Sequence, residues 1–215
     1  MRFVVAMADV ALASLDPRLQ RHVAKAEQAL ARGQIAYGMS VAAAVLAREP
    51  GCAPVRRLLR AAQRQAKATQ KTGLGHLCIR LYASAKRVAW TASRAAAHPL
   101  QAAAVAERAL AADPDALGPL RLLRWAALAA DWPQTAVQAA QDITRQPQAT
   151  ADDWVTLGQA HLRAKETEPA VAAAEGALRV DPTSTQAQGL LKDASVAQSL
   201  QRGWAAEETT ASHPP

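Results

Sequence analysis

The sequence predicts an all-α protein built from helix pairs that repeat along the chain. Its 215 residues are 50% hydrophobic and 20% charged, which is apolar enough for a core and not polar enough for a disordered chain. Aromatic residues make up only 4% of the chain, while alanine and leucine dominate, and such small side chains favour closely approaching helices over sheets. Apolar residues also recur at helical spacing between glycine and proline breaks.

The stretch WVTLGQAHL, residues 154–162, shows the helical pattern most clearly. Trp154, Leu157, Gly158 and His161 stand at offsets of three, four and seven residues, so they share one face of a helix. A glycine inside a helix costs about 1 kcal/mol relative to alanine. We therefore expect Gly158 to lie where a second helix leaves no room for a side chain.

The second half of the chain is periodic. The same residue types return at one fixed spacing in three columns: Leu123 and Leu157; Ala102, Ala136 and Ala170; Ala109, Ile143 and Ala177. Asp-Pro pairs at 113–114 and 181–182 lie two periods apart, and Pro99 and Pro133 open the second helix of successive units. Each unit is therefore predicted to be a helix, a turn, a second helix and a stop.

These columns resemble the tetratricopeptide repeat, whose signature is matched by Trp154, Leu157, Gly158, Ala170, Ala177 and Pro182. The resemblance implies a right-handed α-solenoid of antiparallel helix pairs that ends in a capping helix. It also implies that Gly158 and Ala170 are the small residues at the crossing of two helices. The chain departs from the pattern at His161 and Ala174, where the family usually has larger aromatic residues.

In chain order, we expect six segments. They are an N-terminal segment at 1–16, a first helix pair at 17–52, a basic irregular helix and hinge at 53–82, three repeat units at 83–182, a capping helix at 183–204, and a solvated tail at 205–215. The first pair turns at Arg32-Gly33-Gln34 and carries Gly38 at its crossing, and the hinge is marked by Gly73 and Gly75.

The charge of the chain is unevenly distributed. No acidic residue occurs between Glu49 and Glu107, and this acid-free interval, residues 50–106, holds ten basic residues. The rest of the chain has 15 basic and 18 acidic residues, because the totals are 25 and 18. The net charge of +7 therefore comes from the acid-free interval.

The family resemblance implies that the first helix of each unit lines a concave groove. The residues that it places toward this groove are Arg57, Arg64, Arg87, Arg94, Arg121, Trp125, Gln159 and Arg163. Because arginine and tryptophan are enriched among binding hot spots, we expect a protein or peptide partner with an acidic, extended segment. The alternative is that these cations are solvated and that Trp125 packs between units.

A different function remains open for the acid-free interval. Its helical pattern from Leu74 to Arg94 has an apolar stripe beside a basic one, as in helices that bind a membrane surface or nucleic acid. An ordinary repeat helix packed on its neighbours has the same pattern.

No motif in the chain predicts chemistry. The five histidines are isolated from other metal-ligating residues, Gly73 and Gly75 lack the rest of a phosphate-binding loop, and no nucleophile motif occurs. We therefore expect a protein that is not an enzyme, with no cofactor, no metal and no small-molecule substrate. The predicted role is an adaptor for other proteins.

We expect a cytoplasmic protein. Cys52 and Cys78 form no disulfide framework, and no run of 18 apolar residues could span a membrane. Asp9 interrupts the apolar opening segment, which makes it a poor signal peptide. Export stays an alternative, because Arg2 precedes a short apolar run.

Overall fold

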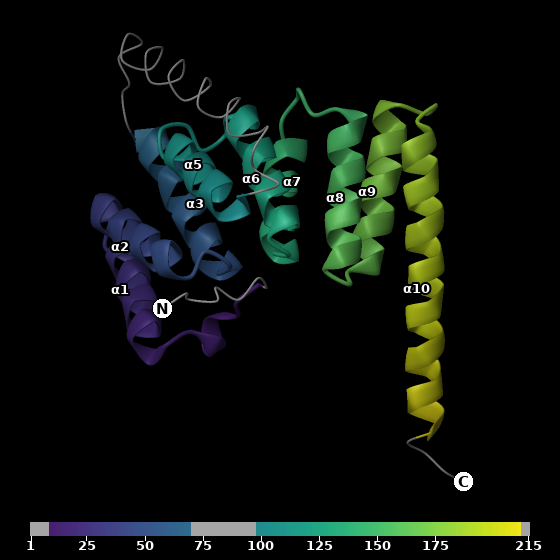
Figure 1. Ribbon diagram of the computed structural model, residues 1–215, viewed down its shortest axis with the longest axis horizontal. Coiled ribbons are helices and arrows are strands. Elements are labelled where there is room, and N and C mark those ends of the chain that lie inside the picture. Colours follow the sequence, from purple (N-terminus) through teal and green to yellow (C-terminus); the bar gives the residue numbers. More distant parts are fainter. Residues whose placement is uncertain (1–8, 70–97, 212–215) are drawn as a thin grey trace. The chain divides into compact units, whose positions relative to one another are not determined.

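The structure is a computed structural model that describes residues 9–69 and 98–211, with side chains through Gly203 (Figure 1). The hinge glycines and the helix predicted from Leu74 lie outside the described residues. The chain divides into two units, residues 1–142 and 143–215. Each unit is described by itself.

Every regular element of the described residues is helical, which confirms the predicted all-α class. The first unit contains a short 3₁₀ helix at Leu12–Ser14 and the helices α1 (Pro17–Ala31), α2 (Ile35–Arg48), α3 (Ala53–Thr69), α5 (Pro99–Leu110), α6 (Leu117–Ala129) and α7 (Pro133–Thr144). The last two residues of α7 lie beyond the boundary of this unit at residue 142. The second unit contains α8 (Ala151–Arg163), α9 (Thr167–Val180) and α10 (Thr185–Ala211). The right-handed sense of the solenoid stays a prediction.

Three helix pairs turn in the same way. In each turn one residue has a positive φ, namely Gly33 (76°), Asp131 (56°) and Lys165 (61°). The N–H of the next residue donates back to a carbonyl in the last turn of the first helix: Gln34 to Ala29 (2.9 Å), Trp132 to Ala127 (2.8 Å) and Glu166 to His161 (2.9 Å). These are the hydrogen bonds of a Schellman helix end.

The shared turn gives the repeat a structural basis. Asp131 and Lys165 are separated by the same interval as Leu123 and Leu157, which is one period of the sequence. Helices joined by so short a turn that also pack on one another must run antiparallel, as α1 and α2 do, and as α8 and α9 do. The described chain is therefore a helical repeat of helix-turn-helix units.

Several helix starts are marked by residues that suit them. Proline occupies the first position of α1, α5 and α7, where its missing N–H costs nothing. Thr150 and Asp153 form a capping box at the start of α8. The start of α7 is capped from a distance, because the Asp9 carboxylate accepts a hydrogen bond from the backbone N–H of Gln134. The N-terminal segment is thus attached to α7.

The helices of the second unit cross closely at small residues. A Cβ on Gly158 would lie 3.3 Å from the Ala170 carbonyl oxygen, which confirms the predicted crossing of α8 and α9. The same Cβ would lie 2.5 Å from Leu190 Cδ2, so α10 also packs over this glycine. Gly38 plays the equivalent role in the first pair, where its Cβ would lie 3.2 Å from the Ala26 carbonyl oxygen.

A second glycine accommodates the repeat tryptophan. Trp154 packs against the buried cluster of Val155, Ala174, Ala177, Ala187 and Leu190. A Cβ on Gly176 of α9 would lie 2.5 Å from Trp154 Cε3. The indole therefore occupies space that any side chain at position 176 would need.

The last helix is longer than expected. We predicted a capping helix at 183–204 followed by a solvated tail, whereas α10 continues to Ala211. The residues just beyond 204 include alanine and glutamate, which are good helix formers, and their polarity does not oppose a helix. None of the described helices combines the length and apolarity needed to cross a membrane.

Replacing Gly158 by leucine tests the crossing. The added side chain has no space between Ala170 and Leu190, so we expect the free energy of unfolding to fall by about 1–3 kcal/mol. Gly189→Leu is the matched control, because a Cβ on this glycine of α10 would have no heavy atom within 4 Å, and leucine has the higher helix propensity. Urea denaturation of both variants measures the difference, and equal stabilities would reject this packing.

Candidate functional site

The predicted partner-binding residues fall into three groups. Arg57, Trp125 and Gln159 are exposed, with Trp125 at 40% of its full accessibility. Arg121 and Arg163 already take part in interactions within the chain. Arg87 and Arg94 lie outside the described residues.

Arg64, the remaining predicted residue, belongs to a row of cations on α3. This α3 ladder consists of Arg56, Arg60, Arg64 and Lys67, spaced by four, four and three residues, so its members share one side of the helix. Its partners are Glu107 at the end of α5, Asp113 and Asp115 between α5 and α6, and Asp142 in α7. Four cations thus meet four carboxylates.

Arg56 is the most deeply buried member of the α3 ladder, with 3% of its surface accessible. Its guanidinium donates from Nε to Glu107 Oε1 (2.7 Å), from Nη1 to Thr135 Oγ1 (2.7 Å) and from Nη2 to the Pro50 carbonyl oxygen (2.7 Å). The same group lies 5.8 Å from the centre of the Trp132 ring, within the range of a cation–π interaction. Every nitrogen of the buried cation therefore has an acceptor.

Arg60 shares the same carboxylate. Its Nη2 donates to Glu107 Oε2 (3.1 Å), and its Nη1 donates to Gln63 Oε1 one turn along α3. The side chain of Glu107 is only 17% accessible. A single carboxylate thus neutralises two buried guanidinium groups, and the loss of Glu107 would leave both without their counter-ion.

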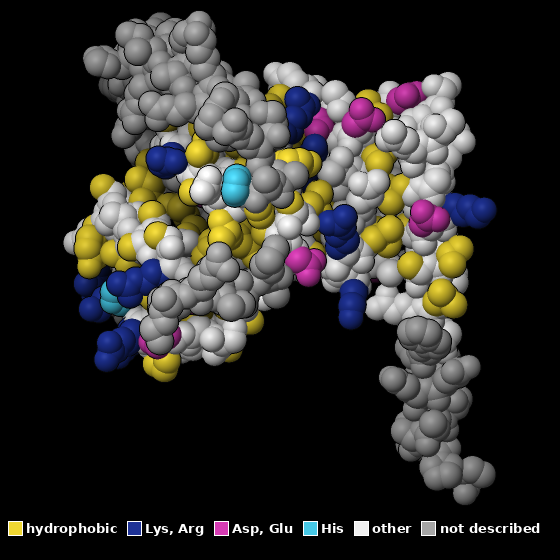
Figure 2. Space-filling model, viewed as in Figure 1, with side chains coloured by type: hydrophobic (Ala, Val, Ile, Leu, Met, Phe, Trp, Pro, Cys, Tyr) yellow, Lys and Arg dark blue, Asp and Glu magenta, His cyan; other side chains and the backbone are white. Residues whose placement is uncertain are grey.

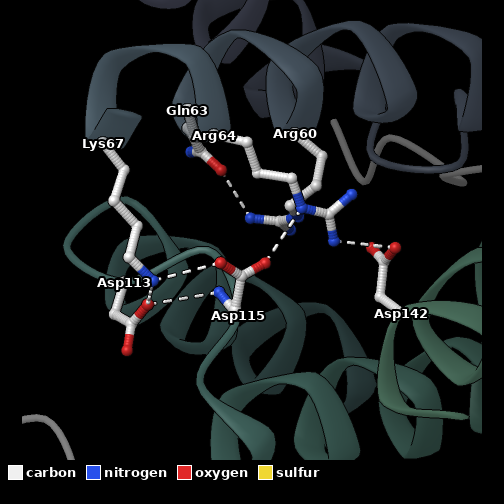
Figure 3. A network of polar contacts seen from close by, with 7 residues as sticks. All are labelled: Arg60, Gln63, Arg64, Lys67, Asp113, Asp115 and Asp142. Carbon is white, nitrogen blue, oxygen red and sulfur yellow. Dashed lines mark hydrogen bonds and ion pairs between the residues drawn. The ribbon is translucent and has the colours of Figure 1, made fainter. Parts of the chain in front are cut away.

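The outer half of the α3 ladder is closer to solvent, since the side chains of Arg64 and Lys67 are 36% and 51% accessible. Figure 3 shows its contacts. Arg64 contacts Asp115 through Nε (2.9 Å) and Asp142 through Nη2 (2.8 Å). The Lys67 ammonium contacts Asp113 (2.8 Å) and Asp115 (3.1 Å). Because Asp115 receives both cations, the pairs form a network rather than isolated bridges.

The network shifts the acidity of its members. Partial burial would raise the pKa of Asp115, but hydrogen bonds from Arg64 and Lys67 outweigh it and hold that pKa below its usual value. The hydrogen bond to Asp113 raises the pKa of Lys67. Both directions favour the charged forms of Asp115 and Lys67.

Most of the described cations of the acid-free interval are paired within the chain. The described cations of this interval are five residues of α3, and four of them are matched by carboxylates of the chain itself. The positive charge that the sequence places in residues 53–69 is therefore largely used for folding. Arg57 is the exception, since it is exposed and has no ion pair among the described residues.

One other residue, His161, has a partner that the sequence pattern did not show. His161 is buried, and its Nδ1 lies 2.6 Å from Glu166 Oε2, across the turn between α8 and α9. Cys52 is a buried free thiol, and burial raises its pKa. Within the part of the chain that the structure describes, no group of three His, Cys, Asp or Glu residues could hold a metal ion.

Comparison with known proteins gives no family. No family model matches the chain, and no curated protein matches its sequence. Among solved structures, the chain is similar to the crystal structure of the MamA protein, with 16% identity, a TM-score of 0.40, and coverage of 92% of this chain and 96% of that one. The description of the repeat therefore depends on its own turns and packing.

Removing the charge of Glu107 tests the buried half of the α3 ladder. Glu107→Gln keeps the shape but leaves Arg56 and Arg60 buried without a counter-ion, so we expect a loss of about 3–5 kcal/mol in the free energy of unfolding. Lys67→Gln removes a half-exposed charge and should cost no more than about 1 kcal/mol. Guanidinium denaturation compares them, and similar losses would contradict the buried role of Glu107.

The pH dependence of stability tests the outer half. Because the folded-state pKa of Asp115 lies below its ordinary value of 3.8, its ion pairs stabilise the fold above that value and are lost as the pH falls through the folded pKa. Asp115→Asn should therefore be less stable than wild type at neutral pH and equally stable in strong acid. Asp193→Asn, which removes an exposed carboxylate of α10, is the control. If the difference in stability between Asp115→Asn and wild type did not change with pH, this linkage would be contradicted.

Proposed function

We propose that this chain is a scaffold, without enzymatic activity, that binds an extended segment of another protein along its helical repeat. The observation that carries the proposal is Trp125, an exposed tryptophan on the first helix of its pair. The other tryptophans with described surroundings are packed: Trp132 is fully buried, and Trp154 lies on the core of the second unit.

The surroundings of Trp125 suit a peptide. Gly118 and Ala129 are exposed on the same face of α6, seven residues before and four residues after Trp125. These small residues extend the exposed face of α6 on both sides of the indole, where a partner backbone can approach it. Tryptophan is among the residues most enriched at binding hot spots.

The proposed partner segment is acidic. Arg57 is exposed on α3 and has no ion pair among the described residues, so its guanidinium is available to a carboxylate. Arg121 lies one turn before Trp125, and Gln159 and Arg163 extend the predicted columns in the second unit. Arg64 would contribute only by exchanging its present carboxylates for those of a partner.

Membrane-surface or nucleic-acid binding by the acid-free interval gains no support from its described residues. Four of their five cations are paired with carboxylates of the chain. Free cations are what both kinds of anionic surface require.

Trp125→Ala tests the proposed surface. Proteins captured from lysate by the wild-type chain are identified, and the affinity of the purified partner is then measured for each variant. As a hot spot, Trp125 should contribute about 2 kcal/mol or more, which weakens binding about 30-fold.

Tyr37→Ala is the matched control, because Tyr37 is an aromatic residue of α2 with 54% of its surface exposed. It should leave the affinity unchanged. A Trp125→Ala variant that melts at lower temperature yet binds its partner normally would assign the indole to packing and remove the proposed surface.

A further inference from the structure

The exposed side of α1 carries a second row of basic residues. This α1 stripe consists of Arg18, Arg21, His22, Lys25 and Arg32, and all five are exposed. The spacing places them on one side of the helix, next to the buried face that includes Leu19 and Val23. From Arg18 to Arg32 the stripe is about 21 Å long at 1.5 Å per residue. Figure 2 shows the basic side chains gathered over α1.

The cations of the α1 stripe have no counter-ions in the described part of the chain. Arg18, Lys25 and Arg32 make no side-chain hydrogen bond or ion pair there, and Arg21 donates only to the Pro17 carbonyl oxygen (3.3 Å). The nearby Asp16 carboxylate accepts from the Arg18 backbone N–H as the helix cap. Glu27 is two residues beyond Lys25, which places it about 200° away around the helix.

This arrangement does not favour the helix itself. Arg18 stands in the first turn of α1, where the helix dipole favours acidic side chains, and no acidic residue is present in that turn. Arg21 and Lys25 are like charges at i and i+4, which also destabilises a helix. Arg32, at the C-cap, suits the helix dipole, but helix stability gives no reason for Arg18, Arg21 and Lys25, in contrast to the α3 ladder.

We propose that the α1 stripe is a docking surface for an acidic segment of a partner protein whose carboxylates recur at helical spacing. The chain itself contains a row of cations that is paired with carboxylates. The α3 ladder has cations at similar spacing, and carboxylates from α5, the α5–α6 connection and α7 match all four of them at distances of 2.7–3.1 Å. A single segment can match such a row only if its own carboxylates recur at helical spacing. The α1 stripe presents the same chemistry outward. It does not involve Trp125 and so stands independently of the surface on α6.

The composition of the α1 stripe favours a protein partner over other polyanions. It contains no phenylalanine, tyrosine or tryptophan on which bases of single-stranded nucleic acid could stack. It also contains no apolar residue that could insert into a lipid surface. Arginine makes up three of its five members and forms bidentate pairs with carboxylates and with phosphates, so the DNA duplex is included among the probes below.

The test compares two triple variants that lose the same charge. Arg18→Gln, Arg21→Gln and Lys25→Gln remove the centre of the α1 stripe. Arg179→Gln, Lys192→Gln and Arg202→Gln remove three exposed cations of α9 and α10. Three probes are used. The first is a fluorescent helical peptide of about 20 residues, which is longer than the stripe and has glutamate at every third or fourth position. The second is the same peptide with glutamine in place of glutamate, and the third is a short DNA duplex. Circular dichroism confirms that all proteins are folded.

The proposal predicts that the acidic peptide binds wild type and that binding weakens about tenfold in the α1 variant and less than about twofold in the control variant. The affinity should fall as salt is raised, and the glutamine peptide should not bind. Equal losses in the two variants, or no binding of the acidic peptide, would overturn it. Tighter binding of the duplex than of the acidic peptide would also overturn it and assign the stripe to nucleic acid. Trp125→Ala should leave peptide binding unchanged, so the two surfaces are tested separately.

Discussion

The first unit depends on one buried cation. The guanidinium of Arg56 contacts Glu107 at the end of α5, Thr135 in α7 and the carbonyl oxygen of Pro50 just before α3, and it lies over the Trp132 ring of the turn between α6 and α7. A buried charge is tolerated here because each nitrogen of the guanidinium has an acceptor and the carboxylate of Glu107 is its counter-ion. The positions of three helices are therefore coupled to one side chain. Alanine-rich helix surfaces, which offer few large apolar contacts, leave this role to a polar group.

Much of the fold could be predicted because its rules are local. The spacing of Trp154, Leu157 and Gly158 predicts a helix face, and Gly158 does lie against Ala170. The period of the sequence returns as equivalent turns at Asp131 and Lys165. Those turns themselves were not recognisable from composition, because an aspartate and a lysine occupy the positive φ that glycine takes at position 33. The continuation of α10 to Ala211 is not predictable from polarity, because polar residues suit a solvent-exposed helix as well as a tail.

The site was predictable only in part. Of the residues that the repeat pattern places toward a groove, Trp125 and Gln159 are exposed, whereas Arg64 and Arg121 are half-buried, and the groove itself stays a prediction. Sequence spacing also groups the cations of the α3 ladder on one side of a helix. It does not reveal that Glu107, Asp115 and Asp142 meet them, since such contacts join residues that are distant in the chain. Only a tertiary fold separates a cation used for packing from one that faces solvent, such as those of α1.

The pairing of Arg56 with Glu107, far along the chain, affects how the protein unfolds. In an ideal solenoid each repeat touches only its neighbours, so the array can unravel one repeat at a time from either end. A contact between such distant residues closes a large loop, and α3, α5 and α7 then gain most of their stability only when all are in place. The helices α3, α5 and α7 should therefore unfold together. The entropy of loop closure grows only slowly with length, by about 0.6 kcal/mol for each doubling, so evolution is free to lengthen or shorten the chain between the two residues at little thermodynamic cost.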